Sequence, residues 1–221
     1  SPVRRDLLAR DEACAQGLVC RAEKPRPYRD YIAWLQKQDL DEANRFWRDY
    51  LRDFSTPTPL AYDRPPQGLA DQNDDAADHC VHLSPDLTAR LTTLAQQHRV
   101  TPNTFVQGAW AILLAYYSGE RDVLFGVTVA GRPTQLLGVE SVLGLFINTL
   151  PLRVSVSPER PVLAWLKDLL AENIRLREYE YTPLIHIQRC SEIPRGEALF
   201  HSLFVFENAP VDPALCEGRI M

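Results

Sequence analysis

Hydrophobic positions in the first quarter of the chain recur at helical spacing. Residues 4–20 predict a weak helix, which the prolines of "EKPRP" at 23–27 end. Residues 28–38 predict a short helix, and residues 40–54 predict a third one with Asp41 as its N-cap. Apolar side chains of this third helix fall at steps of three and four and form one wide aromatic face. The face consists of Ala43, Phe46, Trp47, Tyr50, Leu51 and Phe54.

The middle of the chain predicts two helices that begin in the same way. They follow a Pro- and Asp-rich surface connection at 55–78 and a short strand at 79–83. Ser84 and Thr101 are the expected caps, because each precedes a proline that fits the first helical position. The second helix is expected to end at Gly119. Its inward side chains are predicted to be Phe105, Ala109, Ile112, Leu113 and Tyr116.

Apolar runs in the second half alternate between strands and helices. Strands are predicted at 122–131 and 145–156, as neighbours in a buried sheet, and at 199–208. A long helix at 159–179 and a shorter one at 183–190 lie between them. The stripe of the long helix contains Val162, Leu166, Leu169, Leu170 and Ile174. This order predicts an α/β sandwich, a mixed sheet with helices packed on it.

Two polar residues, Asn148 and Thr149, interrupt the most apolar segment, 140–156. In a strand, Phe146, Asn148 and Leu150 share one face. A buried amide costs about 1–3 kcal/mol if unpaired, so we expect Asn148 to be hydrogen-bonded. One role for it is to tie down a neighbouring strand or loop.

Composition argues against several classes of partner. The 221 residues are 45% hydrophobic and carry a net charge of −5, with no basic stripe for nucleic acid or an anionic membrane. No apolar run reaches the roughly 18 residues of a membrane helix, and no secretory signal is visible. The five cysteines form no CxxC pair, which indicates reduced thiols in the cytoplasm. Motifs of serine hydrolases, dinucleotide-binding proteins and P-loop proteins are absent from the sequence.

Four segments, in order, resemble the condensation domain of nonribosomal peptide synthetases, a relative of chloramphenicol acetyltransferase. "YRDYIAW" (28–34) resembles the family's YxD(F/Y)xxW motif, and "LGLFINTLPLR" (143–153) its (I/V)GxFxNTxxxR motif. "VTVAGRP" and "GVESVLG" form the usual lead-in to the second motif. "EYEYTPLIHI" (178–187) and "PRGEALF" (194–200) stand where the last two family motifs lie, in a different form that weakens any inference about stereochemistry.

The resemblance implies one lobe of a chloramphenicol-acetyltransferase-like fold. The family has two lobes, and the first carries an HHxxxDG motif; this sequence contains no adjacent histidine pair. Residues 25–221 are therefore expected to be the C-terminal lobe, and residues 1–24 the tail of the N-terminal lobe and the hinge. The only methionine is Met221, so either an initiator was removed before Ser1 or the chain was cut from something longer.

By the same resemblance, the parent reaction joins two carrier-bound aminoacyl or peptidyl thioesters in an amide bond. Whether this chain is itself an enzyme stays open, because the catalytic histidine motif belongs to the other lobe. No cofactor is expected to bind directly, since phosphopantetheine arms of carrier domains hold the substrates. The implied partners are the missing N-terminal lobe, donor and acceptor carrier domains and an adjacent adenylation domain. The residues expected at the tunnel floor or lobe interface are Thr128, Gly131, Arg132, Phe146, Asn148 and Thr149.

Two other interpretations stay open at this point. The chain could be a non-catalytic module that docks carrier domains, or a lobe of an epimerisation domain. As half of a cleft, it should expose an apolar patch and an unpaired strand edge near 127–130 and 146–150, and should therefore dimerise or aggregate. Arg132, in the segment expected to bridge the lobes, is either an interface ion-pair donor or merely exposed.

Other candidate chemistry is weak. His82 and Asp86 form an HxxxD pair, but Leu87 stands where the family has glycine. Asp86 in a first helical turn offsets the helix dipole by about 0.3–1 kcal/mol without any catalytic duty. A metal site from His79, Cys80 and His82 is not supported, because strand alternation would separate the ligands.

Overall fold

The computed structural model describes residue 15 and residues 26–60, 79–133 and 135–207. Its chain forms two compact units built from interleaved segments. The first unit contains Ser1–Thr56, Val129–Leu150 and Ile174–Leu199. The second contains Pro57–Thr128, Pro151–Asn173 and Phe200–Met221. The predicted helix at 4–20, apart from residue 15, and most of the predicted surface connection at 55–78 lie outside the described residues.

The sheet of the described residues has the order β2-β1-β3 and is mixed, as predicted. Strand β1 (Asp122–Val129) pairs in parallel with β3 (Leu203–Phe204), with Gly126 opposite Leu203. The amide of Val156, just after β2 (Asn148–Ser155), donates to Arg121 just before β1, so these strands run in opposite directions. β2 is an edge strand of this sheet.

The last strand is much shorter than the prediction for 199–208, which was wrong in its extent. β3 is two residues long, and Val205 and Phe206 beyond it are exposed. A run of Phe and Val indicates side chains that suit a pleated surface, but it does not provide a neighbouring strand to pair with.

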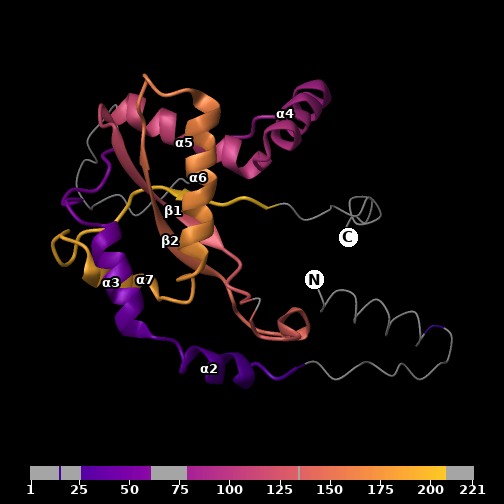
Figure 1. Ribbon diagram of the computed structural model, residues 1–221, viewed down its shortest axis with the longest axis vertical. Helices are drawn as coiled ribbons and strands as arrows, with labels where there is room; N and C mark the ends of the chain where they lie inside the picture. Colours follow the sequence, from indigo (N-terminus) through magenta and orange to yellow (C-terminus); the bar gives the residue numbers. More distant parts are fainter. Residues whose placement is uncertain (1–14, 16–25, 61–78, 134, 208–221) are drawn as a thin grey trace. The chain divides into compact units, whose positions relative to one another are not determined.

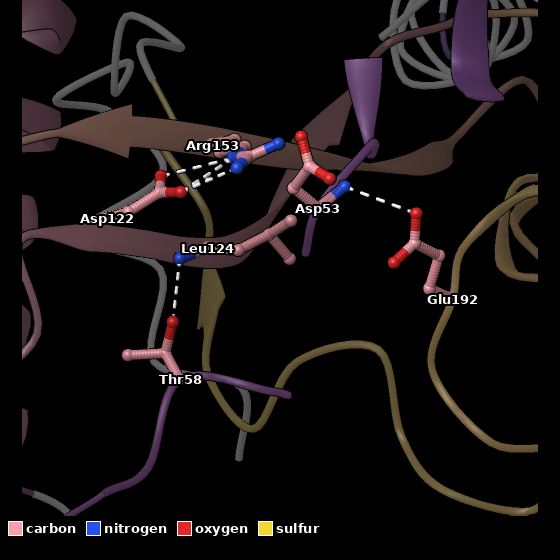
Figure 2. Close-up of polar contacts among 6 residues, drawn as sticks. All are labelled: Asp53, Thr58, Asp122, Leu124, Arg153 and Glu192. Carbon is pink, nitrogen blue, oxygen red and sulfur yellow. Dashed lines mark hydrogen bonds and ion pairs between the residues drawn. The ribbon is translucent and has the colours of Figure 1, made fainter. Parts of the chain in front are cut away.

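Polar contacts hold the first residues of β1 in place (Figure 2). Arg153 on β2 donates from Nε and Nη2 to Asp122 Oδ2 at 2.9 and 2.6 Å, and Nε also reaches Oδ1. The backbone amide of Leu124 donates to Thr58 Oγ1 at 2.7 Å. Thr58 is buried, so the start of the predicted surface connection packs against the strand.

Helices α2 (Arg29–Leu35) and α3 (Leu40–Tyr50) occur close to where periodicity places them. The expected cap was wrong by two residues: Asp39, not Asp41, accepts the amide of Glu42. Asp41 lies in the first turn of α3 instead. The predicted face is confirmed, since all of its residues are buried except the half-buried Phe46. Figure 2 also shows the amide of Asp53, just past α3, donating to Glu192.

Helices α4 (Pro85–His98) and α5 (Pro102–Ser118) begin at the predicted caps. Ser84 and Thr101 accept amides of Leu87 and Thr104, and Gly119 ends α5 with φ +76°. The predicted strand at 79–83 is wrong: this segment has no regular structure and is exposed. Five residues of weak alternation are too few to define a strand without a partner.

The predicted inward face of α5 is wrong. Ile112 and Leu113 are each 46% exposed, and Tyr116 is 79% exposed. The buried side of the helix consists of Thr104, Gln107, Gly108, Ala111 and Leu114.

Helix α6 (Val162–Arg177) is the orange helix of Figure 1. Trp165 Nε1 donates to the carbonyl of Ser155 at the end of β2. Of the predicted stripe, Leu166 and Leu169 are buried, whereas Val162 and Ile174 are exposed. The predicted short helix is α7 (Leu184–Cys190), whose Cys190 contacts Asn44 of α3.

Candidate functional site

The segment between β1 and β2, residues 130–147, contains three of the six residues that sequence analysis marked for a lobe interface, and the other three lie within two residues of its ends. We call it the connecting loop. Apart from a 3-10 turn at Val139–Ser141, its described residues form no helix or strand. They nevertheless have a core of their own, which includes residues of α2. The buried members are Tyr31, Leu136, Val139, Val142 and Phe146, with Tyr28, Trp34 and Leu35 packed against them.

Gly131 joins the two ends of the connecting loop. It is buried and has φ +59°, a left-handed conformation that costs other residues about 1–2 kcal/mol. A Cβ atom at this position would overlap the backbone carbonyl oxygen of Phe146. Only glycine allows the two backbones to lie this close.

Arg132 holds the interior of the connecting loop. Its Nη1 donates to the carbonyl oxygens of Val139 and Val142 at 2.6 and 3.1 Å. Its guanidinium carbon lies 4.2 Å from the ring centroid of Phe146, within the range of a cation–π contact. Arg132 is therefore not merely exposed, because it binds the loop itself; its expected role as an interface ion-pair donor stays a prediction.

The tyrosines of "YRDYIAW" pack directly on the second family motif. Tyr28 donates its hydroxyl to the carbonyl of Leu145 at 2.5 Å, and its ring occupies the space that a Cβ on Gly144 would need. The Tyr28 and Tyr31 rings lie 5.4 and 4.6 Å from that of Phe146, in edge-on and tilted arrangements. The two motifs thus form a single packed unit.

Asn148 is fully engaged, as expected for an amide in this position. Its Nδ2 donates to the carbonyl oxygens of Glu180 and Thr182, both at 2.8 Å, and its Oδ1 accepts the amide of Thr149. This confirms that Asn148 ties down a neighbouring loop, the turn at 179–182 that follows α6. Thr182 is buried, and no partner of its hydroxyl lies in the part of the chain that the structure describes.

Burial dominates the electrostatics around this unit. Desolvation raises the pKa of Tyr31, and the neighbouring Tyr28 and Glu180 raise it further. Desolvation also raises the pKa of Glu180, against the opposing effect of Arg177. Tyr31 therefore stays neutral at pH 7 and acts as a packing group.

The connecting loop directs several apolar side chains into solvent. Leu145 and Ile147 are 73% and 64% exposed and alternate with Phe146, which is buried. Leu137 is 83% exposed and Leu143 39%. We call these four residues the apolar rim. The expected patch thus exists on the loop side, whereas Val127 and Leu150, within the predicted ranges, are buried.

The structure brings three of the six predicted interface residues, Gly131, Arg132 and Phe146, into contact with one another. Gly131 and Arg132 contact Phe146, and Asn148 bonds to Thr149. Phe146 precedes β2, so it does not share a strand face with Asn148 as predicted. Thr128 is the penultimate residue of β1 and is half-buried.

Sequence reasoning missed three contributors to this unit. Arg26 Nε pairs with Asp30 at 2.8 Å, and its Nη1 donates to the carbonyl of Leu137. Gly144 makes room for the Tyr28 ring. The spacing of Arg26 and Asp30, four residues apart, was the available signal for an oriented arginine.

The histidine candidates lie elsewhere and are exposed. His82 and Asp86 are both exposed, and Asp86 lies 3.8 Å from Arg90, one helical turn on. Cys80 Sγ approaches His82 Nε2 at 3.5 Å. Within residues 26–60, 79–133 and 135–207, no group of three or more His, Cys, Asp or Glu side chains could hold a metal ion. No helix in this described part is long and apolar enough to cross a bilayer.

Comparisons with known proteins agree with this architecture. The family model described as the condensation domain matches residues 6–219. A protein of the linear gramicidin synthase of Brevibacillus parabrevis is 48% identical over 206 residues, which are 93% of this chain and 4% of that protein. Chondramide synthase of Chondromyces crocatus is 46% identical over 214 residues, which are 96% of this chain and 5% of that protein.

Solved structures share the fold at lower identity. The first condensation domain of the calcium-dependent antibiotic synthetase, in complex with a substrate analogue, aligns with a TM-score of 0.67 at 19% identity. That alignment covers 87% of this chain and 43% of the other. The chain spans only a small part of the length of the curated relatives it matches. It belongs to the condensation-domain family of nonribosomal peptide synthesis.

Proposed function

We propose that this chain is the C-terminal lobe of a condensation domain and forms one wall of its reaction tunnel. In the reaction, the amine of an acceptor thioester attacks the carbonyl carbon of a donor thioester. A C–N bond forms, the C–S bond breaks, and the donor's pantetheine thiol is released. The observation that carries the proposal is a family match over residues 6–219 in a chain without an adjacent histidine pair.

The described residues support a positioning role rather than a chemical one. The connecting loop is fixed by glycine contacts, by Arg132 and by the tyrosines of α2. Arg132 in the loop and Asn148 directly after it use their polar groups to hold backbone carbonyls. The general base that handles the amine proton would therefore come from the N-terminal lobe, through the HHxxxDG motif of the family.

The apolar rim is the surface we assign to the contact with that N-terminal lobe. Four apolar side chains on a loop with its own packed core are unfavourable to expose, so a partner is expected to cover them. The occupant we choose is the rest of the same domain, because the solved condensation domain is more than twice as long as the part this chain matches. Thr128, at the end of β1, is assigned to the same interface.

The wider partners follow from the family. Donor and acceptor carrier domains would present the substrates on phosphopantetheine, and an adenylation domain would lie next to the condensation domain, in the cytoplasm. The similarity to the long gramicidin and chondramide synthases supports a multidomain setting. The alternatives of a docking module and an epimerisation domain are not favoured by matches to condensation domains.

The test is reconstitution from two halves. The N-terminal half of the matching gramicidin synthase condensation domain, expressed separately, is mixed with this chain and with that synthase's loaded carrier domains. We expect amide product by mass spectrometry only when both halves are present. Product from this chain alone, or none from the mixture while the intact gramicidin domain is active, would contradict the proposal.

A matched pair of variants locates the contact. Leu145→Asp, on the apolar rim, is expected to abolish binding of the added half. Tyr116→Asp, on a similarly exposed position of α5, should leave binding unchanged. Equal effects of the two variants would remove the rim from the interface.

A further inference from the structure

The connecting loop has its backbone carbonyls held by side chains rather than by secondary structure. Arg26 and Tyr28 bind the carbonyls of Leu137 and Leu145, and Arg132 binds two carbonyls between them. Carbonyls in an irregular segment need such partners if the segment is to keep one conformation. The loop is therefore held at two separate points by residues immediately before α2.

The two carbonyls that Arg26 and Tyr28 bind are those of Leu137 and Leu145. These two residues have the most exposed side chains of the apolar rim. Leu137 is 83% exposed and Leu145 is 73% exposed. In each residue, the backbone is fixed while the side chain projects away from the fold. This combination fixes where an apolar side chain stands without burying it.

The two holding side chains are themselves oriented. Asp30 binds Arg26 Nε at 2.8 Å, which directs the other guanidinium nitrogens toward the loop. Tyr28 is fixed by its ring, which lies against Gly144 and 5.4 Å from the ring centroid of Phe146. Neither residue has to be ordered again when the loop meets a partner, which lowers the entropic cost of binding.

We propose that Arg26 and Tyr28 are positioning residues that preset the apolar rim for its partner lobe. They act on condensation through assembly of the two lobes and not through the chemical step. This inference rests on the proposed function, because the partner is the N-terminal lobe. It adds that the first family motif serves the second by holding the carbonyls of its loop.

A minimal variant, Tyr28→Phe, tests this without disturbing the ring packing. It removes one hydroxyl, and its matched control is Tyr117→Phe, which removes one from an exposed tyrosine of α5. Amide hydrogen exchange across residues 135–147 of the full 221-residue chain should accelerate about fivefold to tenfold in Tyr28→Phe, the factor typical for one lost hydrogen bond. Tyr117→Phe should exchange like the unaltered chain.

The second readout separates positioning from plain structural support. In titrations with the N-terminal half of the gramicidin synthase domain, Tyr28→Phe should raise the dissociation constant by about the same factor. Amide formation at saturating partner should be unchanged. Arg26→Lys keeps the positive charge but loses the guanidinium group that binds two partners at once. It should also speed up exchange and raise the dissociation constant.

The results that would overturn this inference differ from those that would overturn the proposed function. Unchanged exchange in Tyr28→Phe overturns the inference. Faster exchange with unchanged affinity, or with lower turnover at saturation, overturns it too. An unaltered chain that binds no partner half and forms no product overturns the proposed function itself, whatever the variants do.

Discussion

The connecting loop has almost no regular secondary structure, whereas α5 is an uninterrupted helix of seventeen residues. The loop's family motifs were readable in the sequence, and Gly131, Arg132 and Phe146 lie in contact, but the shape of the loop was not foreseen. The helix was foreseen to its caps, but its buried face was wrong. The two regions thus differ in the kind of interaction that fixes them.

In α5 the pattern failed because most positions are apolar. With apolar residues all around, periodicity does not select a face. The face is selected by small residues: a Cβ on Gly108 would lie 2.8 Å from Leu166 and 3.0 Å from Trp165. Close approach to α6 at Gly108 then buries Gln107, which accepts a hydrogen bond from Asn173.

The strongest test of this helix compares two adjacent leucines. Leu114 is 5% exposed and Leu113 is 46% exposed. Leu114→Ala should lower the free energy of unfolding by about 3–4 kcal/mol, because it leaves a cavity. Leu113→Ala should lower it by about 1 kcal/mol or less, since half of its surface already contacts water. Urea denaturation of both variants gives the difference, and a larger loss for Leu113→Ala would mean that the face predicted from periodicity was right.

The corresponding test of the loop compares two glycines with positive φ. Gly131→Ala should lower the free energy of unfolding by about 2–3 kcal/mol, since it combines a left-handed conformation with overlap on the Phe146 carbonyl. Gly119 has φ +76° and open space around it, so Gly119→Ala should cost about 1–2 kcal/mol. Urea denaturation of both variants measures the two losses, and their difference is the cost of the overlap with the Phe146 carbonyl. Equal losses would show that the loop ends do not depend on close backbone contact.

How far the sequence predicted each region follows from the range of the interactions involved. Caps such as Ser84 and Thr101 act within four residues, and both were predicted correctly. The contacts of Tyr28 with Leu145 and of Asn148 with the turn at 179–182 span 117 and more than 30 positions. No local pattern encodes these pairings; the family motifs only marked the residues as unusual.

A third test compares how much side-chain hydrogen bonds contribute to the free energy of unfolding near the connecting loop and near α5. Asn148→Ala should cost about 2 kcal/mol, because it leaves two carbonyls without a donor, one of them on buried Thr182. Asn173→Ala, beside α5, removes a side-chain bond to Gln107 and should cost about 1 kcal/mol. Urea denaturation again measures both. A larger loss for Asn173→Ala would reverse the comparison between the two regions.

The smallest expected effect concerns pH and the carboxyl group beside the loop. Because desolvation raises the pKa of Glu180 above its ordinary 4.5, the folded chain binds a proton more tightly there than the unfolded chain. The stability that this group contributes is therefore fully present below pH 4.5 and declines as the pH rises through its folded-state pKa. Glu180→Gln has no such dependence, so its free energy of unfolding should rise relative to the unaltered chain between pH 4 and pH 7. Glu178→Gln, at an exposed neighbouring position, should follow the unaltered chain more closely. A constant difference between the unaltered chain and Glu180→Gln across this range would show that the turn held by Asn148 leaves Glu180 fully hydrated.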